Sequence, residues 1–251
     1  MSEGRPYGFE VVRLARIEAR LVAYDWAWAR DNAERIAENW RRRLALQPGL
    51  FDGPVLLSCL CAIADGTCRI DFFETSYAAF IAYRDGGSPD GHVANAFAAV
   101  VPWSADGAVL LGQMGAHTAN AGQIYFPCGT PDRDDVRGAV VDLAGSAVRE
   151  LREETGLALP GGIADAMAGA WALLRGDGQL AFLYPARFPE TAEALAARME
   201  RHRLAESEPE LERVVTVRGA HEIDAARMPP FVRAYLASAF EADAAEADVT
   251  P

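Results

Sequence analysis

The stretch that decides the fold is Arg149-Glu150-Leu151-Arg152-Glu153-Glu154-Thr155-Gly156-Leu157, in which acidic side chains recur at helical spacing. Glu150, Glu153 and Glu154 stand at positions i, i+3 and i+4, so their carboxylates project from one face of a helix. A second face carries apolar side chains suited to a core, namely Leu143, Ala147 and Leu151. The pattern predicts a helix over 141–155 with an apolar anchor side and an acidic working side.

The acidic side of this predicted helix needs a positive partner. Neighbouring carboxylates repel by a few tenths of a kcal/mol per exposed pair, and by more when they are partly buried. Oxygen-rich clusters suit hard cations such as Mg²⁺ or Mn²⁺, which would also neutralise the phosphates of a substrate. Arg149 lies within reach of Glu153 one turn along, and Gly156 suits the left-handed residue that ends a helix. The alternative is a solvated, salt-bridged face without a ligand.

The order of residues in this stretch resembles a known family. R-E-L-x-E-E-x-G-L is similar to the core of the Nudix box, G-x5-E-x7-R-E-U-x-E-E-x-G-U with U aliphatic. The resemblance implies an α+β fold, an α/β/α sandwich with a mixed sheet, and metal-dependent hydrolysis of a phosphoanhydride bond in a small nucleotide-like substrate. It implies that Glu150, Glu153 and Glu154 bind Mg²⁺ or Mn²⁺, that Glu153 and Glu154 are catalytic with Glu154 nearest the water-bearing cations, and that Arg149 orients them.

The N-terminal half of the box departs from the family pattern. Counting back from the box arginine, Val141 occupies the usual glutamate position, with Asp142 one residue later, and Asp135 occupies the usual glycine position. This departure motivates a second hypothesis of another class, a Nudix-fold nucleotide-binding or regulatory module that has lost hydrolysis. Because the triplet of glutamates is intact, this hypothesis ranks behind the hypothesis that the chain is an enzyme.

The glycine of the box is instead Gly129, within a turn F-P-C-G-T-P over 126–131 that resembles the family's P-G-G turn. The segment 132–140 is then expected to be a lengthened loop. An extended box of this kind is similar to the branch of the family that hydrolyses UDP-glucose and UDP-galactose, and Asp142 and Ser146 match that branch.

The resemblance to this branch continues in the N-terminal part of the chain. It is carried by Trp40, Arg43-Leu44, Gln47-Pro48, Leu50-Phe51-Asp52-Gly53-Pro54 and Thr75-Ser76-Tyr77. The branch's G-T-N element is not reproduced at 78–87, and its pair of arginines is replaced by Gly112-Gln113-Met114. A UDP-sugar therefore leads the list of substrates, while ADP-ribose, coenzyme A, dinucleotides and nucleoside triphosphates stay open.

Further site residues are expected outside the box. In many family members a later loop supplies another glutamate as base or extra ligand, and Glu210 aligns best with it, with Glu208 and Glu212 as rivals and a solvated acidic loop as the alternative. The candidates for substrate binding are Thr75, Ser76, Tyr77, His117 and Gly129. Thr75 or Ser76 is equally suited to cap a helix, and His117 to be a hydrogen-bonded loop histidine.

The apolar periodicity indicates two units joined at a turn-dense segment, 84–91. Residues 1–90 are predicted to form an N-terminal α/β subdomain for substrate recognition, 91–240 the Nudix hydrolase domain, and 241–251 an acidic disordered tail. Helices are expected at 28–46, 76–83, 191–203 and 230–240, and strand hairpins around Asp65-Gly66, Asp106-Gly107 and Gly176-Asp177-Gly178. Because the strands and helices do not alternate regularly, a mixed sheet flanked by helices is predicted.

Composition narrows the classes of partner. The chain of 251 residues has a net charge of −12, which argues against duplex nucleic acid and requires that a phosphorylated ligand meet local arginines or bound cations. No apolar stretch reaches the length of a membrane span, and the N-terminus lacks an export pattern, so a cytoplasmic location without a membrane partner is expected. The four cysteines form no zinc pattern, and nothing in the sequence sets the oligomeric state.

Overall fold

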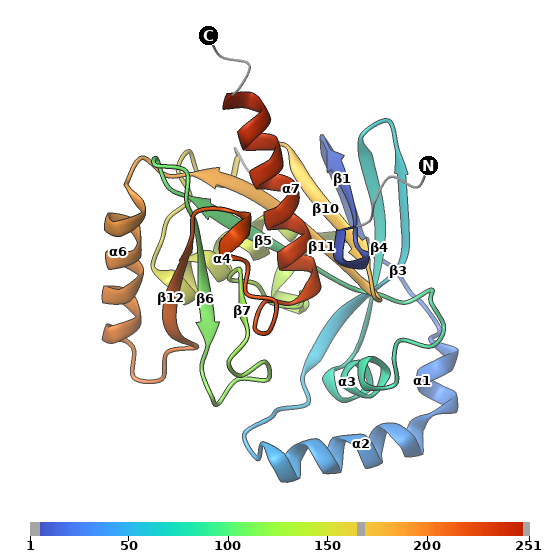
Figure 1. The fold of residues 1–251 in the computed structure, drawn as a ribbon. Helices are drawn as coiled ribbons and strands as arrows, with labels where there is room; N and C mark the ends of the chain where they lie inside the picture. Colours follow the sequence, from blue (N-terminus) through green and yellow to red (C-terminus); the bar gives the residue numbers. More distant parts are fainter. Residues whose placement is uncertain (1–5, 165–168, 248–251) are drawn as a thin grey trace.

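The computed structural model describes residues 6–164 and 169–247, which form two mixed β-sheets with helices packed on them (Figure 1). Sheet A contains seven of the described strands in the order β1-β10-β11-β5-β6-β12, with β7 paired to β6. Its strands are β1 (Glu10–Leu14), β5 (Asn95–Trp103), β6 (Val109–Met114), β7 (Ile124–Tyr125), β10 (Trp171–Gly176), β11 (Gln179–Arg187) and β12 (Leu211–Val217). All neighbouring strands of this sheet are antiparallel except β11 and β5.

The alternation of side chains along β5 places helices on both faces of sheet A. Ala96, Ala98 and Val100 belong to the cluster that includes α4 (Leu143–Thr155) and α6 (Ala192–Ala205). Their neighbours along the strand point to the other face, where they pack against α7 (Pro230–Ala247). This three-layer arrangement agrees with the α+β class and the α/β/α sandwich expected from the sequence.

Sheet B has the order β3-β4-β2-β9-β8. Its strands are β2 (Arg16–Leu21), β3 (Pro54–Ala64), β4 (Thr67–Ser76), β8 (Val136–Arg137) and β9 (Val140–Val141). The β3–β4 hairpin turns at Asp65 and Gly66, whose φ values of 50° and 72° explain the Asp-Gly pair in the sequence. The helices beside this sheet are α1 (Ala27–Asp31), α2 (Ala33–Leu46) and α3 (Tyr77–Asp85).

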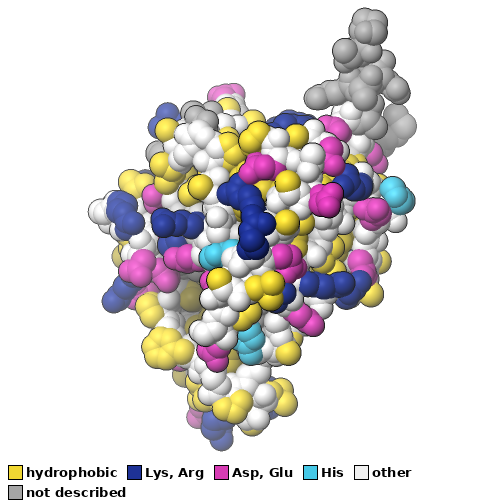
Figure 2. Space-filling view, turned by 90° about the vertical axis from the view of Figure 1, so that its left-hand side faces the viewer, with side chains coloured by type: hydrophobic (Ala, Val, Ile, Leu, Met, Phe, Trp, Pro, Cys, Tyr) yellow, Lys and Arg dark blue, Asp and Glu magenta, His cyan; other side chains and the backbone are white. Residues whose placement is uncertain are grey.

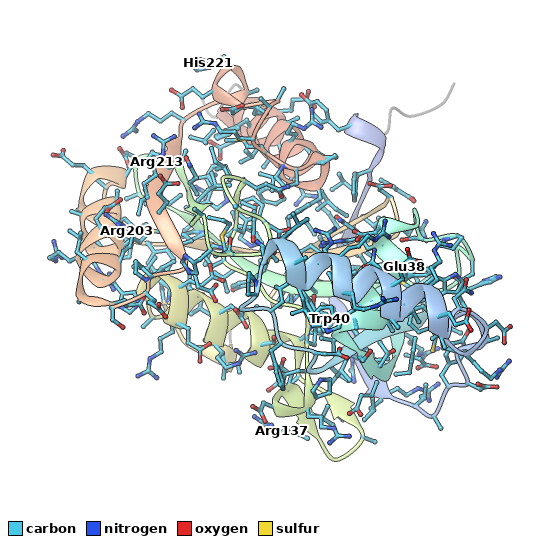
Figure 3. The ribbon with its side chains drawn as sticks, turned by 90° about the horizontal axis from the view of Figure 1, so that it is seen from below. Glu38, Trp40, Arg137, Arg203, Arg213 and His221 are labelled. Atoms are coloured by element: carbon cyan, nitrogen blue, oxygen red, sulfur yellow. The ribbon has the colours of Figure 1, made fainter. Side chains whose placement is uncertain are left out.

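An aromatic cluster fixes the N-terminal helices. Trp26 and Tyr83 pack edge to face with ring centroids 5.1 Å apart, and Tyr83 is buried beneath α1. Trp40 on α2 meets Tyr77 at the start of α3 with centroids 6.1 Å apart. Figure 3, viewed from below, shows α2 with Glu38 and Trp40 labelled and the β8–β9 hairpin with Arg137 labelled. Helix α3 is thereby held where its inner side can face sheet A.

Two segments cross the predicted boundary at residue 90. Strand β1 comes from the N-terminal part but pairs with β10 in sheet A. The segment 132–140, expected to be a loop, instead contains a short 3₁₀ helix, η2 (Arg133–Asp135), and the β8–β9 hairpin, and Val140 pairs with Arg20 of sheet B. Short 3₁₀ helices also occur at η1 (Pro6–Gly8) and η3 (Ala220–Glu222). The two sheets are therefore not separated at residue 90.

Three predicted helix boundaries need correction. Helix α4 begins at Leu143 rather than 141, because Val141 belongs to β9 and Asp142 caps the helix. The helix expected over 28–46 is split at Asn32 into α1 and α2. Helix α7 continues to Ala247, so 241–247 are helical rather than disordered, while 248–251 lie outside the described residues.

The described surface mixes the two signs of charge. Figure 2 shows acidic and basic side chains interspersed on the face that it presents, despite the net charge of −12. Among the described helices, none combines the length and the apolar character needed to cross a lipid bilayer.

Candidate active site

Helix α4 presents its acidic face because its other face is anchored in the core. Leu143, Ala147 and Leu151 are buried, as the spacing predicts. Asp142 caps the helix by accepting a hydrogen bond from the Gly145 N–H at 2.8 Å. The helix ends at Gly156, whose φ of 68° is the expected left-handed conformation. Both ends of α4 are thus fixed.

The three glutamates of α4 do not share one environment. Glu154 is 6% exposed, and its Oε2 atom is buried without a hydrogen-bond partner among the described residues. It lies one helical turn from Glu150, whose side chain is 16% exposed and whose carboxylate raises the pKa of Glu154. Glu153 is 59% exposed and accepts a hydrogen bond from Arg149 at 3.0 Å. The structure therefore pairs Glu150 with Glu154 and leaves Glu153 at the solvent-exposed edge.

Burial and mutual repulsion disfavour the charged forms of the pair. Desolvation raises the pKa of Glu150 to about 6; Arg149 opposes this shift, and Glu153 and Glu210 add to it. Burial also raises the pKa of Glu154 well above its usual range, and the carboxylates of Glu210 and Glu150 raise it further. Without a cation, this pair holds protons at a pH where exposed glutamates are ionised.

The turn at 126–131 fits closely against the carboxylate pair. A Cβ added to Gly129 would lie 2.7 Å from Oε1 of Glu150, so only glycine permits this approach. The backbone N–H of Cys128 lies close enough to the Glu154 carboxylate to oppose the rise of its pKa. Burial raises the pKa of the Cys128 thiol, so the side chain stays neutral beside the acids. The turn thus contributes backbone rather than charged side chains.

A buried aspartate that the sequence analysis did not assign to the site holds Arg149. The Nη2 atom of Arg149 donates to both oxygens of Asp135, at 3.2 and 3.3 Å, and Asp135 is 4% exposed. Ser146 also donates to this carboxylate, at 3.1 Å. The Nη1 atom of Arg149 lies 2.8 Å from Oε1 of Glu150. Asp135 comes from η2 in the inserted segment, so its role depends on how that segment folds back on α4.

The acidic cluster meets the chemical requirements of a divalent cation only in part. An unpartnered buried carboxylate oxygen beside a second carboxylate is a suitable donor set for Mg²⁺ or Mn²⁺. Within the described ranges, however, no three His, Cys, Asp or Glu side chains form a group able to hold a metal ion. Glu153 pairs with Arg149 instead of completing a triplet. Of the three predicted ligands, only Glu150 and Glu154 are therefore placed to offer carboxylate oxygens to a cation.

A cavity of about 530 Å³ is lined by the turn residues Cys128 and Gly129, which contact this cluster, whereas none of the three glutamates of α4 lines the cavity. Four of the predicted residues line it: Tyr77, His117, Gly129 and Glu210. Thr75 and Ser76 do not; Thr75 pairs with Val55 inside sheet B, and Ser76 caps α3 by accepting from the Ala79 N–H at 3.1 Å. The capping alternative is therefore the correct interpretation of Ser76.

Glu210 lies just before β12, at the edge of the cavity. It is exposed, and its carboxylate is close enough to raise the pKa values of both Glu150 and Glu154. Its rival Glu212 accepts a hydrogen bond from Gln113 at 2.9 Å, and neither Glu212 nor Glu208 lines the cavity. Of the three candidates, Glu210 has the position expected of a base or an extra ligand.

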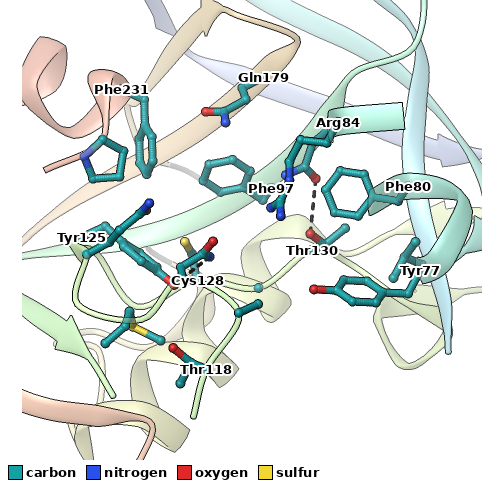
Figure 4. A pocket seen from close by; sticks show the side chains of 18 of the residues that line it. Tyr77, Phe80, Arg84, Phe97, Thr118, Tyr125, Cys128, Thr130, Gln179 and Phe231 are labelled. Atoms are coloured by element: carbon teal, nitrogen blue, oxygen red, sulfur yellow. Dashed lines mark hydrogen bonds between the residues drawn. The ribbon is translucent and has the colours of Figure 1, made fainter. Parts of the chain in front are cut away.

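The sequence analysis missed most of the opposite wall of the cavity. Figure 4 shows Phe80 and Arg84 of α3 together with Phe97 of β5 and Gln179 of β11. Phe97 reads as an ordinary core position in an apolar strand, and Arg84 falls in the turn-dense segment taken as a boundary. No local pattern marks these residues, because they come from distant segments.

Comparisons with known proteins give only weak likenesses. No protein-family model matches the chain, and no curated protein matches its sequence. Among solved structures, the Nudix hydrolase RenU from M. smegmatis is 18% identical, with 60% of this chain and 84% of that chain covered and a TM-score of 0.35. The MutT protein from Methanosarcina mazei Go1 is 14% identical, with coverages of 60% and 96% and a TM-score of 0.36. At these values the chemistry of this chain rests on its own side chains.

Proposed function

We propose that this chain is a Nudix-type hydrolase that uses Mg²⁺ or Mn²⁺ to cleave the phosphoanhydride bond of a nucleoside diphosphate linked to another group. The observation that carries the proposal is the buried pair Glu150 and Glu154, with one carboxylate oxygen unpartnered, behind the turn at Cys128 and Gly129 that lines a cavity of about 530 Å³. Two adjacent buried carboxylates are costly unless protons or cations neutralise them, and a phosphorylated ligand needs the same cations.

Each protein group has a distinct part in this reaction. Glu150 and Glu154 would hold the metal, with backbone oxygens of the turn at Cys128 and Gly129 and an inward turn of Glu153 completing the donor set. When bound, the metal supplies charge neutralisation of the pyrophosphate and a more acidic water. Arg149, fixed by Asp135, keeps Glu150 in position. Glu210 takes a proton from the attacking water, and the oxygen of that water bonds to phosphorus. The bridging P–O bond breaks, and the leaving phosphate keeps its electron pair.

A UDP-sugar leads the proposed substrates because the extended box and the segments at 40–54 and 75–77 resemble that branch of the family. Tyr77 from the second of these segments lines the cavity, which supports a role for the N-terminal part in substrate recognition. ADP-ribose, coenzyme A and dinucleotides have the same diphosphate core and remain in the proposed class.

A second function, nucleotide binding without hydrolysis, is favoured by one observation. No three metal-ligand side chains stand ready as a group within the described residues. In such a module the buried Glu154 would stay protonated without a cation, and the cavity would hold a regulatory ligand.

A product assay separates the two functions. The chain is incubated with UDP-glucose, ADP-ribose, coenzyme A, a dinucleotide and nucleoside triphosphates, each with Mg²⁺, Mn²⁺ or EDTA, and the products are identified by mass spectrometry. We expect metal-dependent release of a nucleoside monophosphate and a phosphorylated partner from at least one diphosphate. Saturable nucleotide binding without any product under all conditions would instead support the binding module.

A further inference from the structure

The cavity has a second end whose walls are aromatic. Phe97 is 6% exposed and is held by an edge-to-face contact with Phe231, with centroids 5.3 Å apart. Phe80 faces the cavity from α3 and packs against Tyr77 at 6.0 Å. In Figure 4 the side chain of Arg84 is drawn between Phe80 and Phe97, above Cys128. Rigid aromatic walls of this kind suit a planar ring rather than a flexible chain.

Arg84 supplies the positive charge at this end. Its guanidinium carbon lies 5.7 Å from the centroid of Phe80, and the residue is half-buried. Within the described residues its guanidinium forms no ion pair and no side-chain hydrogen bond. Because the guanidinium has only donors, a ligand group that meets it must offer acceptor oxygens or nitrogens.

Asn95 adds a second donor beside it. Its Oδ1 atom accepts a hydrogen bond from the Thr130 hydroxyl at 3.3 Å, which leaves the Nδ2 amide group as the free donor of this side chain. Asp177 and Glu210, the carboxylates in the cavity wall, belong to exposed residues, and Asp177 precedes Gly178, whose carbonyl accepts a hydrogen bond from the Asn95 N–H at 2.9 Å. The half-buried guanidinium of Arg84 and the amide group of Asn95 are therefore the donors that this end offers to a ligand ring.

We infer that this end binds the nucleobase of the substrate and selects bases with a carbonyl oxygen at C4 of a pyrimidine or C6 of a purine over bases with an amino group there, with Arg84 and Asn95 as the specificity-determining residues. Uracil and guanine present carbonyl acceptors where cytosine and adenine present amino donors. A donor-rich wall satisfies the first pair and leaves the amino groups of the second facing other donors. The inference rests on the proposed function for the place of the phosphates and adds the identity of the base.

The test measures binding without metal, so that it does not depend on turnover. Isothermal titration calorimetry in EDTA compares UMP, GMP, AMP, CMP and ribose 5-phosphate on the full chain. We expect UMP and GMP to bind about tenfold more tightly than AMP and CMP, the size of one hydrogen bond to a charged group, and ribose 5-phosphate to bind weakest.

Two variants assign this preference to residues. Arg84→Met keeps an unbranched apolar stem but removes the donors, and should weaken the binding of UMP and GMP about tenfold while that of AMP and CMP changes by less than about threefold. Asn95→Asp keeps the acceptor for Thr130 and replaces the donor by an acceptor, so the ratio of UMP to CMP affinity should fall. Arg41→Met, at an exposed position on α2, is the matched control and should change none of these values.

Several results would overturn the inference. They are equal binding of all four nucleotides, no binding of any of them, or an unchanged ratio of UMP to CMP affinity in both variants. The proposed function fails separately, if the wild-type chain shows this base preference in EDTA but forms no product from any diphosphate with Mg²⁺ or Mn²⁺.

Discussion

The two ends of the cavity are built in opposite ways. Behind the acidic end, Glu150 and Glu154 come from one helix, and so does the arginine that supports Glu150. The aromatic end takes its residues from α3, β5, β11 and α7, which lie far apart in the chain. The carboxylates proposed to bind metal are thus encoded in one contiguous motif, whereas the residues proposed to select the base are brought together by packing.

The largest loss of activity is expected from a substitution in the acidic pair alone. Glu154→Gln should lower metal-dependent kcat/KM by about a thousandfold, because the amide cannot provide the negative charge that a cation requires. Binding of UMP in EDTA should persist, since the aromatic end is untouched. Steady-state kinetics and calorimetry measure the two quantities, with Glu38→Gln on the exposed side of α2 as control. Full activity of Glu154→Gln would remove this residue from the proposed mechanism.

A smaller loss of activity is expected when a methyl group is added to the turn at 126–131 where it contacts α4. In Gly129→Ala the new methyl group would meet Oε1 of Glu150 at 2.7 Å. Displacing this carboxylate should lower kcat/KM by about a hundredfold, and the crowding should cost about 1–3 kcal/mol of unfolding free energy. Gly49→Ala is the control, because an added Cβ there meets nothing within 4 Å. Equal kinetics for the two variants would contradict the tight fit at Gly129.

The acidic end should also make the metal-free chain less stable as the pH rises. The folded pKa of Glu150 is raised to about 6, so between its ordinary value and pH 6 the folded chain holds a proton that the unfolded chain has lost. The stability that this proton contributes is therefore present at pH 4 and lost by pH 7. Over this range the free energy of unfolding should fall by about 2 kcal/mol. Denaturant unfolding in EDTA, compared with Glu150→Gln at both pH values, measures the difference. A constant difference between the two proteins would contradict it.

The smallest loss of activity is expected at Asp135, which contacts the carboxylate pair only through Arg149. Asp135→Asn keeps the shape of the side chain but removes the charge that holds Arg149, so Glu150 is positioned less well. We expect kcat/KM and Mn²⁺ affinity to fall about tenfold, as for supporting groups around a metal site. Asp134→Asn, exposed and next in the chain, is the control. An unchanged Mn²⁺ affinity, measured by electron paramagnetic resonance, would restrict Asp135 to a structural role.

The local elements of the fold could be predicted because their signals lie within a few residues. The spacing of Leu143, Ala147 and Leu151 gave the buried face of α4, and Asp65-Gly66 gave the β3–β4 turn. Helix ends were less predictable. Asp142, one residue after the usual glutamate position of the box, is the cap of α4. The strand before this helix is marked only by the pairing of Val140 with Arg20 of sheet B.

The sequence by itself determined that Glu150 and Glu154 share a helix face, since helical geometry fixes the angle between residues four apart. The contact of Asp135 with Arg149, fourteen residues away, and the exposed position of Glu153 depend on how the inserted segment folds back on α4. The aromatic end could not be predicted from the sequence either, because Phe80, Phe97 and Phe231 come from separate segments and line one cavity only after packing. Helical spacing is a local property of the backbone, whereas these contacts depend on the path of the whole chain.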